Sequence, residues 1–211
     1  MKNKKTVAIL VGFFIVLSAA FMTYFYSVTK VNPKQKPLPY FGEGEHKVRP
    51  FSFTNQEGEL VTNKTTEGKI YVAEYFFATC QGICPKMNEN LNKVYQQYKG
   101  NPDVLFLSHT VDPEEDSAAA LKEYGKQFEA DPKQWMFLTG DKKALYDQAR
   151  YSYLINAEDT NTSTSIDKDF IHDNHFVLVD RYGRLRGIYD GLMPQEMGRL
   201  AEDIKALLQA K

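Results

Sequence analysis

The stretch Ile70-Tyr-Val-Ala-Glu-Tyr-Phe-Phe-Ala-Thr-Cys-Gln-Gly-Ile-Cys-Pro85 decides the fold of this chain. Its first eight residues are almost continuously apolar or aromatic, which predicts a central strand buried on both faces. Apolar residues then recur at helical spacing, so we expect a helix over 85–98, with the proline in its first turn. Cys80 and Cys84, the only cysteines of the chain, therefore stand at a strand-to-helix turn.

Strand patterns and helix patterns alternate along the rest of the chain. A short strand at 51–54 and a turn at 55–58 precede the decisive stretch. The later pattern predicts two more buried strands, at 104–111 and 135–138, and three helices, at 116–128, 142–150 and 194–208. An antiparallel hairpin is expected at 176–179 and 185–189, around Tyr182-Gly183. This alternation predicts an α/β sheet with helices on both faces. The polar stretch 157–169 is expected to be a surface loop.

The N-terminus predicts a membrane anchor. Lysines at positions 2, 4 and 5 precede an uncharged stretch, 6–28, that is long enough to cross a bilayer as a helix. The lysines mark the cytoplasmic end by the positive-inside rule, so the rest of the chain is expected on the extracytoplasmic side. A cleaved signal peptide is the alternative, because Ser18-Ala19-Ala20 offers small residues, but the apolar run is longer than a signal peptide needs.

Proline and glycine divide the remainder into a linker and one domain. We expect an anchor over 1–30, an extended linker over 31–48 and a single globular domain over 49–211. The 211 residues carry 26 Lys and Arg against 27 Asp and Glu, a net charge of -1. That balance gives no support to a nucleic-acid-binding surface, which needs a basic excess.

The cysteine spacing indicates redox or metal chemistry rather than a structural disulfide. The N-terminus of the following helix is expected to stabilise both thiolates, which are the reactive and metal-binding forms. Three residues between the cysteines leave room for a metal ion. Two thiolates and one imidazole suit copper, whereas zinc normally takes a fourth ligand. The histidines are His46, His109, His172 and His175, and spacing alone does not choose among them.

Three segments together resemble the Sco/SenC family of membrane-anchored copper proteins. They are Phe76-Phe-Ala-Thr-Cys-Gln-Gly-Ile-Cys-Pro85, Val111-Asp-Pro-Glu-Glu-Asp116 and His172-Asp-Asn-His-Phe-Val-Leu-Val-Asp-Arg-Tyr-Gly183. The similarity covers about residues 49–208 in the family's order. It implies a thioredoxin-like fold, with a central mixed sheet flanked by helices behind the N-terminal transmembrane helix.

The resemblance also implies a site and a role. The family's ligand histidine stands eleven residues before the hairpin glycine, which corresponds to His172. The resemblance therefore implies Cys80, Cys84 and His172 as copper ligands, while His175 is a second imidazole that the family commonly lacks. The implied function is a copper metallochaperone for the copper A centre in subunit II of cytochrome c oxidase. Other copper carriers or thiol-disulfide proteins are further implied partners. The implied location is the inner (cytoplasmic) membrane, with one span and the domain on the periplasmic side.

Two enzymatic alternatives use the same thiols. A thiol-disulfide oxidoreductase would act on the cysteines of the oxidase subunit or of other extracytoplasmic proteins. Glu74 favours it, since thioredoxins place a buried acid six residues before the first cysteine, and a buried carboxyl must be neutral or paired. Glu74 is equally compatible with a structural role, in which it meets a lysine or a hydrogen-bond donor at a strand end. A peroxiredoxin-like peroxidase needs an arginine beside the cysteine, and none is near Cys80 in sequence.

Overall fold

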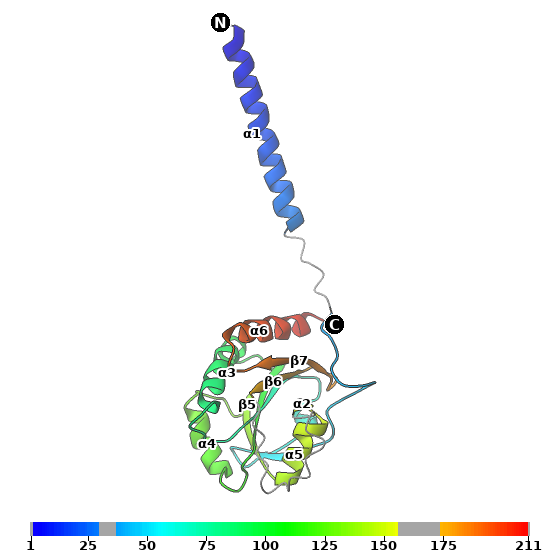
Figure 1. Ribbon diagram of the computed structural model, residues 1–211, viewed down its shortest axis with the longest axis vertical. Helices are drawn as coiled ribbons and strands as arrows, with labels where there is room; N and C mark the ends of the chain where they lie inside the picture. Colours follow the sequence, from blue (N-terminus) through cyan, green and yellow to red (C-terminus); the bar gives the residue numbers. More distant parts are fainter. Residues whose placement is uncertain (1, 30–36, 156–173, 211) are drawn as a thin grey trace. The chain divides into compact units, whose positions relative to one another are not determined.

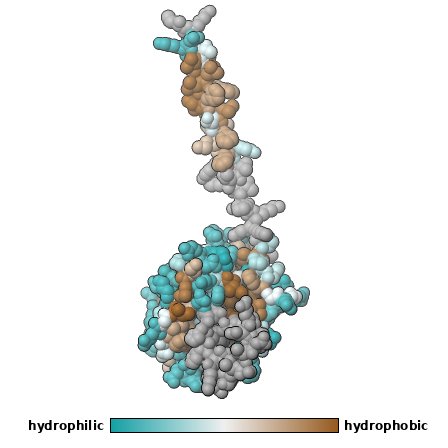
Figure 2. Space-filling view, viewed as in Figure 1, coloured by the Kyte–Doolittle hydropathy of each residue, from teal (hydrophilic) through white to brown (hydrophobic). Residues whose placement is uncertain are grey.

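The computed structural model describes residues 2–29, 37–155 and 174–210, and it divides into two compact units, 1–37 and 38–211 (Figure 1). The first unit consists of one helix, α1 (Lys2–Thr29). Its segment Thr6–Phe25 has a mean hydropathy of 2.3 and no charged residue, and its brown surface in Figure 2 reflects this composition. By length and composition α1 can cross a membrane, which agrees with the expected anchor.

The second unit is built on a seven-stranded mixed sheet in the order β2-β1-β5-β4-β3-β6-β7. The three central strands β3 (Ile70–Phe76), β4 (Val104–Thr110) and β5 (Trp135–Thr139) are parallel, and nearly all their residues are buried. The outer strands run antiparallel to their neighbours: β1 (Ser52–Asn55), β2 (Leu60–Thr62), β6 (His175–Val179) and β7 (Leu185–Asp190). The predicted mixed sheet is therefore confirmed.

Helices cover both faces of this sheet. The face that carries Val72 and Phe76 packs against α3 (Cys84–Tyr98), α4 (Ala118–Lys126) and α6 (Pro194–Gln209), and we call it the α3 face. The opposite face, which we call the α5 face, packs against α5 (Lys142–Tyr151). Figure 1 shows α3, α4 and α6 on one side and α5 on the other. The short helix α2 (Asn63–Thr66) and strand β2 were not predicted.

The compact unit begins eleven residues before the predicted domain start at Arg49. Within the predicted linker, Phe41 and Val48 donate backbone hydrogen bonds to the β6–β7 hairpin, at 3.1 and 2.9 Å. Arg186, buried and paired with Asp180 at 2.8 Å, donates to two further carbonyls of this segment. Residues 38–48 therefore pack along the outer strand β7, whose edge would otherwise lack backbone partners. Residues 31–36 of the predicted linker lie outside the described residues, as does the predicted loop 157–169.

Candidate metal and redox centre

The two cysteines meet where the central strand β3 passes into α3. Cys80 is half-buried on the connecting turn, where its N–H donates to Phe77 O at 3.2 Å. Cys84 is the first residue of α3 and is 5% exposed. Both thiols are free, and the side chains are within hydrogen-bond contact of each other. The sequence prediction that these thiols meet is confirmed by this contact.

The helix start makes the two thiols chemically different. Burial by itself raises the pKa of Cys80, but hydrogen bonds from the Cys84 thiol and from the N–H groups of Cys84, Gly82 and Ile83 outweigh it, so the pKa falls below its usual value. Burial raises the pKa of Cys84 to about 12, and donation of its S–H to Cys80 adds to this. The prediction of two stabilised thiolates is correct for Cys80 and wrong for Cys84, because Cys84 is the donor and lies deeper.

A buried carboxylate fixes the turn that carries Cys80. Asp116, 1% exposed, accepts hydrogen bonds from Ala78 N–H at 3.1 Å and from the Thr110 hydroxyl at 2.5 Å. Ala78 lies two residues before Cys80, and Thr110 ends the neighbouring strand β4. Asp116 thereby ties the cysteine turn to the end of β4. In the sequence, Asp116 only ends the Val111–Asp116 motif, and no local pattern indicates this role.

Glu74 is buried beneath the cysteine helix, on the α3 face of β3. It is 1% exposed, and its Oε1 accepts a hydrogen bond from the Ser108 hydroxyl at 2.5 Å. Burial raises its pKa to about 8, against the lowering effect of Ser108. Within the described part of the chain, Glu74 meets the Ser108 hydroxyl and the Asn88 amide rather than a lysine.

A hydrogen-bonded network links Glu74 to α3 and α4. The Trp135 indole N–H donates to Ser108 Oγ at 2.9 Å, behind the Ser108–Glu74 bond. With the Asn88 amide oriented so that both its groups are satisfied, its nitrogen donates to Glu74 Oε1 at 2.5 Å and its oxygen accepts from the Tyr124 hydroxyl at 2.8 Å. Asn88 lies one helical turn after Cys84, so the network ends directly under the deeper thiol. Nothing in the spacing of these residues singled out Asn88 beforehand.

His109 lies on the other face and is separate from the cysteines. It is fully buried, stacks on Tyr75 with ring centroids 4.9 Å apart, and meets Phe53 and Tyr153 edge-on or tilted. Its Nδ1 lies 3.2 Å from Glu74 O, while Nε2 has no hydrogen-bond partner within the described residues. Burial lowers the pKa of His109 to about 4. His109 is therefore a neutral core residue rather than a ligand.

The other three histidines divide between described and undescribed parts of the chain. His172 lies outside the described residues. His175 opens β6, where strand alternation places it on the α5 face with Val177, whereas Cys84 packs on the α3 face. The Nε2 atom of His46 lies 2.9 Å from Ser152 O, so His46 is held against α5 rather than solvated. Within the described ranges, no third His, Cys, Asp or Glu joins the two cysteines in a group that could hold a metal ion.

Known proteins are similar to this chain both in sequence and in fold. A family model described as SCO1/SenC matches residues 42–209. The SCO1 protein homolog of Bacillus subtilis (strain 168) is 28% identical over 163 residues, which cover 76% of this chain and 82% of that protein.

Two solved structures extend this comparison. BsSco, described as having a disulfide switch and as a member of the Sco family of cytochrome c oxidase assembly proteins, is 28% identical with a TM-score of 0.66, over 83% of this chain and 98% of that chain. ScoI of Bradyrhizobium japonicum, solved with copper bound, is 26% identical with a TM-score of 0.59, over 76% of this chain and 99% of that chain.

Proposed function

Because the chain belongs to the SCO1/SenC family, we propose that it is a copper metallochaperone that serves the assembly of cytochrome c oxidase. The observation that carries the proposal is the contact between the Cys80 and Cys84 thiols at the start of α3. Two sulfurs this close form one side of a soft-metal site. The copper-bound ScoI relative and the assembly role of the Sco family support copper as the cargo and the oxidase as its destination.

The proposed copper ligands are Cys80, Cys84 and His172. The family register counted from Gly183 favours His172, and the alternation of β6 places the competing His175 on the face away from Cys84. His109 is sealed in aromatic packing on that same far face. The proposed recipient is the copper A centre of oxidase subunit II.

Copper titration of the full chain in detergent tests this proposal. The reduced protein is expected to bind one copper, and Cu(II) to give a sulfur-to-copper charge-transfer band. Either Cys80→Ser or Cys84→Ser should abolish the band, because no neighbouring side chain replaces a thiolate. His172→Ala should weaken Cu(II) binding strongly, and His175→Ala, as the matched control, should have a small effect. Retention of the band in a cysteine variant would refute the dithiolate site.

The proposed location is a single membrane span with the domain outside the cytoplasm. The lysines before the span of α1 support this orientation. Protease added to intact cells whose outer layers are permeable should digest the domain, whereas a cytoplasmic domain would be digested only after the inner membrane is disrupted.

A second proposed activity is thiol-disulfide exchange, which the unequal thiols favour. Cys80, with its lowered pKa, is suited to attack a substrate disulfide, and the buried Cys84 is suited to resolve the mixed disulfide. The pair then loses two electrons and two protons to the substrate, which leaves as a dithiol. Alkylation mass spectrometry after mild oxidation should find an intramolecular Cys80–Cys84 disulfide, and this form should not bind copper. Two thiols that remain free would count against the activity.

A further inference from the structure

The β6–β7 hairpin turn carries a cluster of exposed aromatic and cationic side chains that the copper proposal does not use. Tyr182 at the turn is 70% exposed, and Tyr40 in the segment along β7 is 60% exposed. The Arg184 guanidinium lies over both rings, at 5.3 Å from the Tyr40 centroid and 6.0 Å from the Tyr182 centroid. The Arg186 guanidinium also lies over the Tyr40 ring, 4.2 Å from its centroid. The two tyrosines are therefore held in place while remaining in solvent.

A basic hollow of about 430 Å³ adjoins Tyr182. Tyr182 lines it together with Lys47, Lys64 and Arg181, and Glu67 is its single carboxylate, so the lining carries a net charge of +2. Arg181 forms an ion pair with Asp103, with 3.7 Å between Nη2 and Oδ2. Within the described residues, neither Lys47 nor Lys64 has an ion pair with a carboxylate. Lys47, Lys64 and Tyr182 at the hollow, together with Tyr40, which Arg184 links to Tyr182, form what we call the hairpin surface.

The covalent chain limits how far this surface can be from the membrane. Only residues 30–37 connect the end of α1 to Leu38, where the second unit begins. Eight residues span at most about 30 Å even when fully extended. The chain enters the domain beside this cluster, since Arg186 donates to the carbonyls of Leu38 and Pro39. The short tether therefore joins the domain next to the hairpin surface.

We propose that the hairpin surface docks on the bilayer, with anionic phospholipid headgroups at Lys47 and Lys64 and with Tyr40 and Tyr182 at the headgroup level. Tyrosine is enriched at membrane interfaces because one end of its ring is apolar and the other is polar. Lysine and arginine side chains attract anionic headgroups that come within about a Debye length of them. Docking would hold the domain against the membrane and restrict the directions in which the cysteine turn can face. The proposal rests on α1 as a membrane anchor and is independent of copper.

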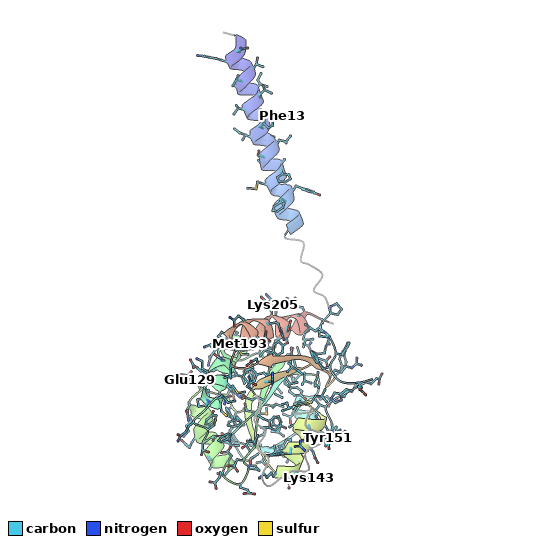
Figure 3. The ribbon with its side chains drawn as sticks, in the orientation of Figure 1. Phe13, Glu129, Lys143, Tyr151, Met193 and Lys205 are labelled. Carbon is cyan, nitrogen blue, oxygen red and sulfur yellow. The ribbon has the colours of Figure 1, made fainter. Side chains whose placement is uncertain are left out.

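Lysine acylation of the full chain in nanodiscs tests the proposal with native side chains. The chain is placed at one copy per disc in phosphatidylglycerol discs and in phosphatidylcholine discs. A low dose of an acetylating reagent is added, and the rate of acetylation of each lysine is measured by mass spectrometry. Lys47 and Lys64 should be labelled at least about fivefold more slowly in phosphatidylglycerol, and high salt should remove the difference. Lys142 and Lys143 serve as internal controls and should be labelled equally in both lipids. Figure 3 shows Lys143 on α5, at the other end of the domain from Lys205 on α6.

A pair of matched variants separates the aromatic contribution from general charge. Tyr40→Ser combined with Tyr182→Ser should reduce the lipid-dependent protection of Lys64, because the apolar contact is lost. Tyr151→Ser removes an exposed tyrosine of α5 that also lies under an arginine, and it should leave the protection unchanged. Equal labelling of Lys47 and Lys64 in both lipids, with the chain retained in the discs, would overturn the docking proposal alone. Failure of the chain to remain in either disc would overturn the anchor and the docking proposal together.

Discussion

Glu74 and His109 are buried on opposite faces of the central sheet, and their surroundings differ. Glu74 and His109 lie on the paired strands β3 and β4, where Glu74 pairs with Ser108 and Tyr75 with His109. On the α3 face, hydrogen bonds from Ser108 and Asn88 surround Glu74 and lead to the helix of Cys84. On the α5 face, aromatic rings surround His109 and leave its Nε2 unpartnered within the described chain. The difference indicates that the acid belongs to the cysteine site and the histidine to the core.

Among the substitutions proposed, Glu74→Gln, which removes the carboxyl group, should change the pH dependence of the free energy of unfolding most. Its pKa is raised to about 8 in the folded chain from 4.5, so its contribution is complete below pH 4.5 and is lost as the pH rises through 8. The loss is on the order of 4 kcal/mol over this window. In Glu74→Gln, the free energy of unfolding measured with urea should no longer decline over this pH window. A decline of equal slope in the variant would assign it to another group.

His109 should act in the opposite direction and over a more acidic window. Its pKa is lowered to about 4 from 6.5, so its contribution is complete above pH 6.5 and is lost as the pH falls through 4, on the order of 3 kcal/mol. In the wild type the two effects therefore offset each other between about pH 4.5 and 6.5. His109→Phe should remove the acid loss and expose the Glu74 decline, measured by the same urea unfolding. Its copper binding should equal that of the wild type, and weakened binding would break the assignment of His109 to the core.

Asp116 should have the smallest effect on stability and a local effect on the cysteine turn. Asp116→Ala leaves Ala78 N–H and the Thr110 hydroxyl without an acceptor, which should cost about 2 kcal/mol. It should also raise the alkylation rate of Cys80, since the turn is released from β4. Asp116→Asn retains an acceptor oxygen and serves as the control. An unchanged Cys80 rate in Asp116→Ala would mean that the turn is held by α3 alone.

The sequence predicted the sheet well because burial and periodicity are local signals. The continuous apolar run of β3 and the helical spacing after Pro85 are both visible along the chain. The contact of residues 38–48 with β7 was not predictable, because it depends on a buried Arg186 that holds carbonyls about 150 residues away. Proline in that stretch is typical of a linker, and only the tertiary partner shows otherwise.

The candidate site was predictable in its residue types but not in its electrostatics. The spacing of Cys80 and Cys84 indicated that the thiols meet, and the apolar strand indicated that Glu74 is buried. The opposite pKa shifts of the two thiols arise from which one donates and which one lies deeper, and sequence spacing contains neither fact. Asn88 and Asp116 act through contacts with other elements, so no local pattern identified them.

X-ray absorption at the copper edge of the Cu(II)-loaded full chain is the sharpest test of the proposed ligand set. We predict two sulfur scatterers together with imidazole scattering among the copper ligands of the wild type. The imidazole signal should disappear in His172→Ala and remain in His175→Ala, while both sulfurs remain in each variant. A single sulfur in the wild type, or imidazole scattering that survives in His172→Ala and is lost in His175→Ala, would contradict the proposed Cys80, Cys84 and His172 site.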